Sequence, residues 1–415
     1  MADSKRVTSL ARVRSGQRIT LGGPAQPATG HAVSLRESNR LARAERSRFN
    51  RRVAACLAVL AALAFVSLGI MGAQGRTYLG SHEYAFYNPV QVAYALYLHA
   101  YNAIATSTHL FGAYSSQWLT DNVPGYWAVI SRAGVIGITI VCAVLLSTSG
   151  MLYQNVFRNP LAGPGMLGVS TGVGLGVMIL VLLYGGAAQA MVGQRYALCY
   201  GLGAAILAAV MLGGRKLSGP RGTDVVSLLL VGSIFSQMLG FIVSYVTLFV
   251  MDDTDYATYF EVSQMLTVDT SALSWICLGI AALVSIVPIF LLRFQMNSLA
   301  FPDDEVRVLG LSGQRLRVVA LLCGGIMILA AQVHTGMVGM VSLIVPFLSR
   351  SWFGCEFSKQ FTGNVCISTV LLLACRDIAD LVPFVGDGLA VGSVVGLVAL
   401  PLFLAVVYRQ QRNWE

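Results

Sequence analysis

Charged residues are scarce in this chain. Only 11% of its 415 residues are Asp, Glu, Lys or Arg, and 56% are hydrophobic, whereas a soluble domain carries about 25% charged residues. So few charges exclude an ordinary soluble protein and leave lipid as the solvent. The net charge of +9 does not indicate nucleic-acid binding, because twelve of the 28 basic residues lie within residues 1–52 and most others lie at the ends of apolar runs.

Motifs that would indicate an enzyme are also missing. The chain contains no G-x-x-x-x-G-K-[ST] phosphate loop, so we do not expect it to hydrolyse ATP itself. It contains no C-x-x-C pair, and its eight cysteines are scattered singly, which argues against a zinc site or a disulfide framework. The closely spaced Gly172, Gly174 and Gly176 lie in an apolar run, where small residues let helices approach closely. We therefore predict no catalytic residue and no metal or cofactor bound directly.

Long apolar runs are what the chain has instead. A bilayer core about 30 Å thick is crossed by about 20 apolar residues in a helix. Ten stretches meet or approach this length and predict an all-α polytopic membrane protein with about ten transmembrane helices. These stretches are 53–72, 131–153, 166–184, 196–213, 225–250, 272–292, 318–333, 337–352, 361–379 and 389–408.

The basic residues orient these crossings, because cytoplasmic loops carry an excess of Lys and Arg. With the N-terminus in the cytoplasm, the outside keeps only four of the 28 basic residues, and the opposite orientation would invert that ratio. We therefore predict that both termini are cytoplasmic, with residues 409–415 as a short C-terminal segment. The four outside residues are Arg76, Arg132, Arg195 and Arg376.

Residues 1–52 are rich in Arg, Ser, Gly and Pro and poor in large apolar residues. Such a segment cannot bury enough surface to offset the entropy of ordering. We predict a basic, disordered cytoplasmic tail, with an Arg-rich transit peptide as the alternative. The run 53–72 is followed by no convincing cleavage site, so it is predicted to be retained and to begin a transmembrane domain that extends to residue 408.

Two loops are longer than a connection requires. The outer loop 73–126 holds many tyrosines and Trp118; it could form interfacial helices or a cover over a pore, and an interfacial aromatic belt is the more usual arrangement. In the cytoplasmic loop 293–317, Pro302 precedes three acidic residues and predicts a helix start, and Gly310 predicts its stop. A short helix on the cytoplasmic face could dock a partner.

Ionisable residues within the predicted crossings are few, and such residues often mark a transport path. Arg376, Asp377 and Asp380 form the main cluster, near the outer end of their helix. A transport role and a structural ion pair are both open for them. His334 lies near a helix end at membrane depth, where a single histidine is more often packed or hydrogen-bonded than a haem or metal ligand.

One block of the sequence is highly specific. Residues 158–172 read Arg-Asn-Pro-Leu-Ala-Gly-Pro-Gly-Met-Leu-Gly-Val-Ser-Thr-Gly and closely resemble the FecCD family, the permeases of bacterial importers for ferric siderophores, haem and cobalamin. The motif is carried by Arg158, Asn159, Pro160, Leu161 and Gly168. Further blocks follow in the family's order, over about residues 53–408: 149–154, 228–232, 303–310, 339–346 and 391–403.

The resemblance implies the fold of a type II ABC importer permease in the bacterial plasma (inner) membrane. It implies a second permease, identical or paralogous, and two ATP-binding subunits below that hold the ATP and Mg. It also implies an extracytoplasmic substrate-binding protein above. The pore would lie between the two permeases and be lined in part by the helices at 225–250 and 389–408.

The same resemblance assigns site residues. The cytoplasmic gate is expected near Val225 and Val226. Arg132 matches a residue that docks the binding protein, and Arg376 is expected to take part because Leu381 stands where another docking arginine is common. The coupling helix that meets the ATPase is expected at 302–310, with its contacts made by Asp303, Asp304, Arg307, Leu309 and Gly310.

A ferric-siderophore importer is the leading hypothesis, and a haem or cobalamin importer of the same family is the alternative. Departures such as Phe347 and Ala390, where the family usually has His and Pro, bear on the substrate rather than on the fold. From another class, an ion-coupled secondary transporter would need intramembrane acids and interrupted helices around a midplane site. A membrane-embedded haem carrier would need paired histidines, which are absent.

Overall fold

The computed structural model describes residues 35–69, 89–108, 114–123, 125–218, 225–264, 268–301, 303–336, 338–381 and 390–411. The chain divides into two compact units, Met1–Arg48 and Phe49–Glu415. The described part of the first unit, residues 35–48, is helical. All other elements belong to the second unit.

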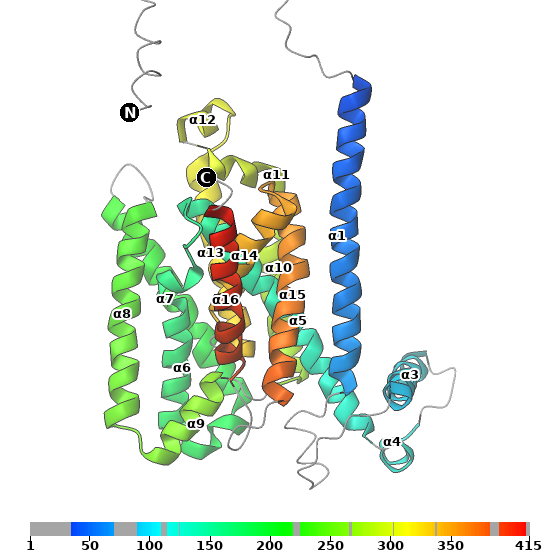
Figure 1. Cartoon of the computed structure of the whole chain (residues 1–415). Helices are drawn as coiled ribbons and strands as arrows, with labels where there is room; N and C mark the ends of the chain where they lie inside the picture. The colour runs from blue at the N-terminus through cyan, green and yellow to red at the C-terminus, as the bar shows by residue number, and fades with distance from the viewer. Residues whose placement is uncertain are drawn as a thin grey trace, which may run out of the picture. The chain divides into compact units, whose positions relative to one another are not determined.

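Each of the ten predicted crossings corresponds to one helix of the structure (Figure 1). The helices are α1 (Leu35–Gly69), α5 (Tyr126–Phe157), α6 (Val169–Tyr184), α7 (Val192–Ser218), α8 (Val225–Phe249), α10 (Ala272–Leu291), α13 (Gly313–Thr335), α14 (Met340–Phe353), α15 (Phe357–Leu381) and α16 (Val391–Gln411). Shorter elements connect them: α3 (Pro89–Thr108), α4 (Ser116–Asn122), α9 (Asp253–Gln264), α11 (Arg293–Met296), α12 (Asp303–Val308) and the 3₁₀ turns η1 (Pro164–Leu167), η2 (Gly185–Ala190) and η4 (Asn297–Ala300).

Length and composition agree with a membrane fold. Within the described part of the chain, seven helices are long and apolar enough to cross a bilayer: α1, α5, α6, α7, α8, α10 and α13. Helices α14 and α16 supply shorter apolar stretches. Helix α15 has 25 residues and carries the ionisable residues that the sequence singled out. The predicted all-α membrane protein of about ten helices is confirmed.

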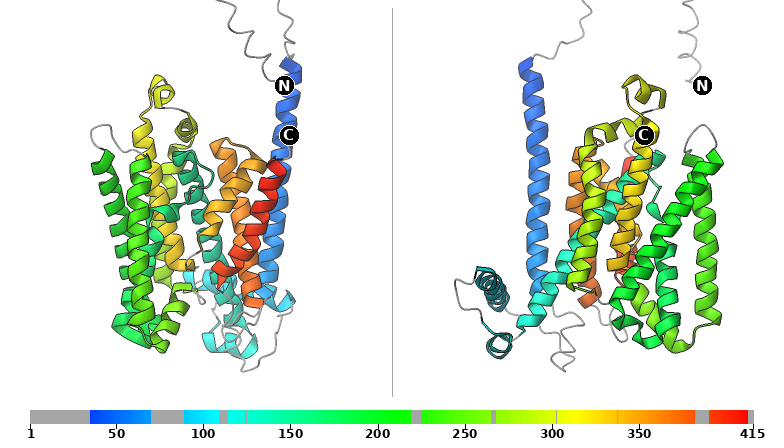
Figure 2. Two further views of the ribbon diagram at one scale, coloured as in Figure 1. Left: turned by 60° about the vertical axis from the view of Figure 1, so that its left-hand side comes forward. Right: turned by 180° about the vertical axis from the view of Figure 1, so that it is seen from behind.

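The bundle has two ends, seen at the top and bottom of Figure 1. Helices α11 and α12 lie at one end, called here the α12 end, where α5, α7 and α14 finish and α6, α8 and α15 begin. Helices α9, α3 and α4 lie at the opposite end, called the α9 end. Figure 2 shows the same two ends from other sides.

Most residues of helix α5 are buried, and α13, α14 and α15 pack around it. Its small residues allow that packing: a Cβ added to Gly150 would lie 1.6 Å from the carbonyl oxygen of Ser342 on α14. The hydroxyl of Ser149 donates to the carbonyl of Gly324 on α13 at 2.6 Å. Close backbone approach and side-chain-to-backbone hydrogen bonds are the usual means of joining helices in lipid, where apolar contact alone gives little preference.

The structure differs from the predicted disorder of residues 1–52 at 35–52, which form the first half of α1. Residues 1–34 lie outside the described residues. The physical reason is helix propagation: once the apolar run has nucleated α1, extension through Arg, Ala, Leu and Glu adds one hydrogen bond per residue and needs no burial. Composition alone does not predict this extension of the helix.

The predicted outer loop 73–126 contains helices α3 and α4, and its residues 73–88, 109–113 and 124 lie outside the described part. A separate apolar cluster joins α3 and α4 to the first turns of α5, with Leu98, Leu119 and Tyr126 at its centre. Trp118 stacks on Tyr114 with ring centroids 4.3 Å apart.

Candidate coupling and translocation surfaces

The short helix α12 completes the connection between α10 and α13. The chain leaves it through Gly310, whose φ of 74° lies in the left-handed region that glycine adopts at low cost. The amide of Leu311 donates to the carbonyl of Val306 at 3.2 Å and closes the turn. The helix predicted between Pro302 and Gly310 is therefore present, and Pro302 itself lies outside the described residues.

Two contacts fix the segment that precedes α12. Arg158, the residue that ends α5, donates from Nε to the carbonyl of Leu299 at 3.0 Å and from a terminal nitrogen to the carbonyl of Phe301. The side-chain oxygen of Asn297 accepts from the amide of Phe357 at the start of α15, at 2.8 Å. A guanidinium suits the paired donation because its N–H groups form a rigid fork. The approach to α12 is thus held by both α5 and α15.

Burial in and just after α12 is one-sided. Val306 is 1% exposed and packs on the bundle, whereas Val308 and Leu309 are 88% and 62% exposed. The neighbouring Glu305 and Arg307 are also exposed. Adjacent exposed apolar residues with charge around them are typical of a surface that another protein covers.

The structure brings the five expected coupling residues into this one segment. Asp303 and Asp304 lie in the first turn of α12, although their side chains are outside the described part. Arg307 lies in the last turn of the helix, and Leu309 and Gly310 follow in the exposed turn. Arg158 of the motif contacts the residues just before this segment, at Leu299 and Phe301.

The specific block of the sequence forms the turn between α5 and α6. Arg158 adopts a left-handed conformation with φ of 50° and ends α5. The side chain of Asn159 accepts from the amide of Leu161 at 2.9 Å, an Asx turn that reverses the chain. Pro160 lies inside that turn. Gly168, with φ of 73°, then separates η1 from α6.

Helix α8 packs closely on this turn. A Cβ added to Gly232 would lie 2.7 Å from the carbonyl oxygen of Met166, so only glycine permits the approach. Gly168 lies against the backbone of Ser236 on the next turn of α8. The hydroxyls of Thr171 and Ser236 are 3.2 Å apart and hydrogen-bonded.

A hollow of about 460 Å³ opens beside this contact on α8. Helix α8 contains no charged residue, and its polar side chains recur at helical spacing along one face. Gln237 is exposed there, and its amide forms no hydrogen bond in the structure. The hollow is lined by Met166, Leu229, Leu230, Ser233, Ser236 and Gln237.

Val225 and Val226, the expected gate, form the first turn of α8 at the α12 end. Their side chains lie outside the described part, as do residues 219–224 before them. Their role stays a prediction from the family resemblance.

Arg132 and Arg376, the expected docking residues, belong to a buried ionic cluster. Arg132 on α5 pairs with Asp377 on α15 at 2.9 Å and also with Asp380. Its Nε donates to the carbonyl of Ser67 on α1 at 3.2 Å, and the hydroxyl of Ser67 donates to Asp377 at 2.6 Å. The Nε of Arg376 is 3.4 Å from Asp380. The cluster joins three helices at the α9 end.

This geometry bears on the docking role expected for Arg132 and Arg376, which stays a prediction. Arg132 is only 8% exposed and Arg376 only 6%, and both face carboxylates of their own chain. A partner's acidic side chain cannot reach them without breaking these pairs. Of the two interpretations left open by the sequence, the structural ion pair is the one observed.

His334 is packed and hydrogen-bonded, as the sequence predicts for a lone histidine at this depth. Its Nδ1 lies 3.0 Å from the hydroxyl of Ser274 on α10, and its Nε2 lies 3.1 Å from the hydroxyl of Tyr200 on α7. Tyr196 lies 3.4 Å from Nδ1 and donates to Asp269 at 2.9 Å. In the described part of the chain, no group of three His, Cys, Asp or Glu is placed to hold a metal ion.

Asp269, in the loop before α10, anchors this network. Partial burial acts to raise its pKa, but hydrogen bonds from the side chain and amide of Ser271 and from Tyr196 outweigh that, so the pKa is lowered from its usual value. The buried guanidinium of Arg195 lies 5.2 Å from the ring centre of Tyr196. These groups join α7, α10 and α13 at the α9 end.

The partners of both clusters could not be predicted from the sequence. Arg195 is predicted as an outside loop residue, yet it is buried in the first turn of α7. Ser67 and Asp269 carry no sequence signal of their own, because their partners are far away in the chain. The one available signal is an arginine within an apolar stretch, which must find an internal acceptor in lipid.

Comparison with known proteins identifies the family of the chain. The profile of the FecCD transport family matches residues 96–409, so the match begins within α3. A relative from Helicobacter pylori, named "Probable iron chelatin transport system permease protein", is 26% identical over 273 residues, covering 66% of this chain and 79% of that protein. The hemin transport system permease protein HmuU of Yersinia pestis is 24% identical over 304 residues, covering 72% and 89%.

A solved structure has the same fold at lower identity. "An inward-facing conformation of a putative metal-chelate type ABC transporter" aligns with a TM-score of 0.62 and 18% sequence identity, covering 87% of this chain and 99% of that chain. The family match, the membrane helices and this shared fold agree. The chain belongs to the FecCD transport family and is a membrane permease of an ATP-binding-cassette importer.

Proposed function

We propose that the chain imports ferric-siderophore-type chelates across the bacterial plasma (inner) membrane, driven by ATP hydrolysis on a separate subunit. The named relatives carry iron chelatin and hemin, both bulky iron chelates. A hemin-type substrate is the second candidate, favoured by the likeness to the Yersinia permease.

The observation that carries this proposal is the uncharged polar face of α8. Gln237 lies midway along a helix that is apolar enough to cross a bilayer, and it is exposed. Lipid would leave its amide without hydrogen-bond partners, which costs several kcal/mol on transfer to hydrocarbon. The face with Ser233 and Gln237 therefore suits a water-filled path, and its lack of charge suits a large chelate better than a coupled ion.

The pore would form between this chain and a second permease, identical or paralogous. Helices α8 and α16 both expose large apolar side chains that a partner can cover, including Phe241 and Leu248 on α8 and Leu397 and Leu404 on α16. Val225 and Val226 would close the path at the α12 end. Two of the four subunits would be ATPases that bind the ATP and Mg.

The coupling contact is proposed at α12. Its exposed Val308 and Leu309 would enter the ATPase, and Asp303, Asp304 and Arg307 would set the charge pattern around them. The α12 end would then be cytoplasmic, together with both termini. The extracytoplasmic binding protein would meet the α9 end through residues other than Arg132 and Arg376.

Growth and uptake in cells that lack the chain test the substrate. Ferric hydroxamate, ferric catecholate, ferric citrate and hemin are supplied singly as iron source, and cobalamin uptake is measured in parallel. We expect growth on at least one ferric chelate to require the chain. Loss confined to hemin or to cobalamin would replace the ferric-siderophore assignment.

The energy source is tested in the same cells with radioactive iron chelate. Depletion of ATP should stop uptake, while collapse of the proton gradient with ATP maintained should leave most of the initial rate across this membrane. Uptake that follows the proton gradient alone would favour an ion-coupled transporter.

A further inference from the structure

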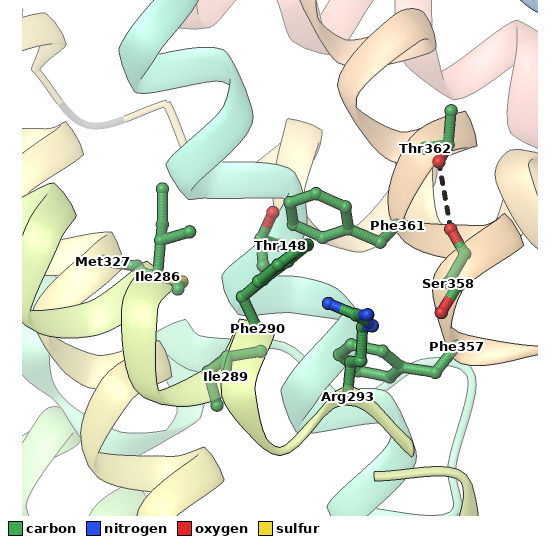
Figure 3. Close-up of a pocket in the computed structure, with 10 residues that line it drawn as sticks. All are labelled: Thr148, Ile286, Ile289, Phe290, Arg293, Met327, Phe357, Ser358, Phe361 and Thr362. Carbon is green, nitrogen blue, oxygen red and sulfur yellow. Dashed lines mark hydrogen bonds between the residues drawn. The ribbon is translucent and has the colours of Figure 1, made fainter.

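A second cavity lies between α10 and α15, near the α12 end and away from α8. Its volume is about 220 Å³. Figure 3 shows side chains from α5, α10, α11, α13 and α15 around it, with the guanidinium of Arg293 directed toward the middle of the group. The lining residues are Thr148, Ile286, Ile289, Phe290, Arg293, Met327, Phe357, Ser358, Phe361 and Thr362.

The two helices on either side of the cavity, α10 and α15, pack mainly on other helices, and this leaves space between them. Helix α10 packs against α13, whereas α15 packs against α5 and α14, and α11 touches α15 at the α12 end. Toward the α9 end the Trp275 ring of α10 lies against Gly137 of α5. The cavity reaches the surface beside Phe290, which is 54% exposed.

Most of the wall is hydrocarbon and aromatic ring. A cavity of this kind does not hold water well, because water needs polar partners on several sides. At membrane depth the available apolar molecule is lipid, whose acyl chain matches Ile286, Ile289 and Phe361 in chemistry.

One cation lies at this apolar wall. The Cζ of Arg293 is 4.3 Å from the ring centre of Phe290 and 4.7 Å from that of Phe294. No carboxylate lies within 4.0 Å of Arg293 among the residues that the structure describes. Its N–H groups are therefore available to an anion, and phosphate is the anion that a guanidinium binds with two parallel hydrogen bonds.

A second polar group of the wall is buried and has no partner. Thr148 on α5 is fully buried, and its Oγ1 forms no hydrogen bond. A buried hydroxyl without a partner costs about 1–3 kcal/mol, so a ligand that supplies an acceptor here would gain from it. Figure 3 shows Thr148 on the same cavity as Arg293.

We propose that this cavity binds one anionic phospholipid from the leaflet at the α12 end. Its phosphate meets Arg293, its acyl chain lies along Ile286, Ile289 and Phe361, and an ester carbonyl accepts a hydrogen bond from Thr148. Basic pockets between transmembrane helices bind anionic lipid head groups in the same way. The proposal needs only residence in the membrane, which the family and the helices establish.

The site is separate from the proposed transport path. None of its lining residues belongs to α8 or α12. Substitutions at Arg293 and Thr148 therefore test lipid binding without removing a group that we assign to the pore or to the ATPase contact.

The test uses the purified full-length chain in detergent. Dioleoyl phosphatidylglycerol, dioleoyl phosphatidylcholine and inorganic phosphate are titrated separately, and the midpoint of thermal unfolding is recorded. A ligand that binds only the folded protein raises that midpoint, and at equal concentration the tighter ligand raises it more. We expect phosphatidylglycerol to raise the midpoint more than phosphatidylcholine, and phosphate alone to have no effect.

Three variants locate the effect. Arg293→Gln should weaken phosphatidylglycerol binding about tenfold or more and bring it to the level of phosphatidylcholine. Thr148→Val, which keeps the shape, should weaken both lipids. Arg215→Gln removes an exposed arginine at the same end on α7 and should change neither.

Crosslinking gives a second readout that does not depend on stability. A phosphatidylglycerol with a photoreactive acyl chain, in vesicles with phosphatidylcholine, should label peptides of α10 and α15. Equal binding by wild type and Arg293→Gln, a response to phosphate alone, or labelling spread evenly over the bundle would each overturn the proposal.

Discussion

The Nε of Arg158 lies 3.0 Å from the backbone oxygen of Leu299 and donates a hydrogen bond to it. The two residues come from different parts of the chain, because Arg158 ends α5 and Leu299 lies in η4, shortly before α12. A residue of the most specific sequence block is thereby a support for the segment that carries α12. Its importance to the family motif gains a physical explanation.

Arg158→Lys should weaken this support while keeping the charge. An ammonium cannot reproduce the rigid fork that serves two carbonyls, and hydrogen bonds from a charged donor contribute about 1.5–3 kcal/mol each. We expect normal membrane insertion and a substantial loss of transport and of ATPase stimulation by substrate in the reconstituted complex. Arg215→Lys is the matched control, and equal transport by both variants would contradict a supporting role.

The double change Val308→Ser with Leu309→Ser should weaken the binding of the ATPase subunit to the permease. Each side chain is largely exposed in the isolated chain, so the folded permease should lose little stability. Burial of such a side chain in a partner contributes about 1.5–3 kcal/mol, so affinity should fall at least tenfold. Co-purification measures it, with Leu217→Ser at the same end as the control.

The charge pattern of α12 gives an independent version of the same test. Asp304→Lys combined with Arg307→Glu inverts two charges without altering apolar area. If ATPase association and uptake both survive that exchange, α12 is not the coupling element.

Cysteine labelling should establish which end faces the cytoplasm. Cys355 is a natural, exposed cysteine between α14 and α15 at the α12 end. An impermeant maleimide added to intact cells should leave it unlabelled, and should label a cysteine introduced at Gln117 in α4. Cys355→Ser identifies the signal, and labelling of Cys355 from outside would reverse the proposed orientation.

Arg132→Met should destabilise the folded chain. It leaves Asp377 and Asp380 without their main counter-charge, and breaking a buried pair on one side costs about 3–5 kcal/mol. The midpoint of thermal unfolding should fall clearly below that of Arg215→Met. Unchanged stability with lost binding-protein association would restore the docking role that the structure argues against.

Asp269 should give the protein a limited acid sensitivity. Its lowered pKa means that the folded state favours the carboxylate, so this stabilisation is complete above the usual aspartate pKa and is lost as pH falls through the lower folded value. The contribution of Asp269 to thermal stability in detergent should therefore stay nearly constant from pH 8 to pH 5. Asp269→Asn should flatten the decline below about pH 4, and Asp121→Asn on α4 should not.

Crossings were predictable because lipid leaves few alternatives: a run such as 272–292 must be a helix, and α10 spans Ala272–Leu291. Boundaries were less predictable where a polar residue caps the helix. Helix α13 begins at Gly313 rather than at 318, because Ser312 accepts from the amide of Arg315 and extends the helix through basic residues.

The residues of the candidate site were likewise predictable where their signals are local and unpredictable where their partners are distant in the chain. The α12 segment could be predicted because its signals, an acidic first turn and a closing glycine, are local. The environment of Arg132 could not, because Ser67, Asp377 and Asp380 meet it only after three helices have packed. Whether this arginine faces a partner protein or pairs with carboxylates of its own chain depends on its burial, which is a property of the folded chain.

The glycine at position 232 makes α8 and the α5–α6 turn inseparable neighbours. With no side chain between them, neither can shift sideways without displacing the other, and Arg158 lies at the beginning of that turn. A displacement of Leu299 would therefore reach α8, which carries Gln237, through the Arg158 hydrogen bond and the contact at Gly232. This path is shorter than the covalent path through α10 and α9.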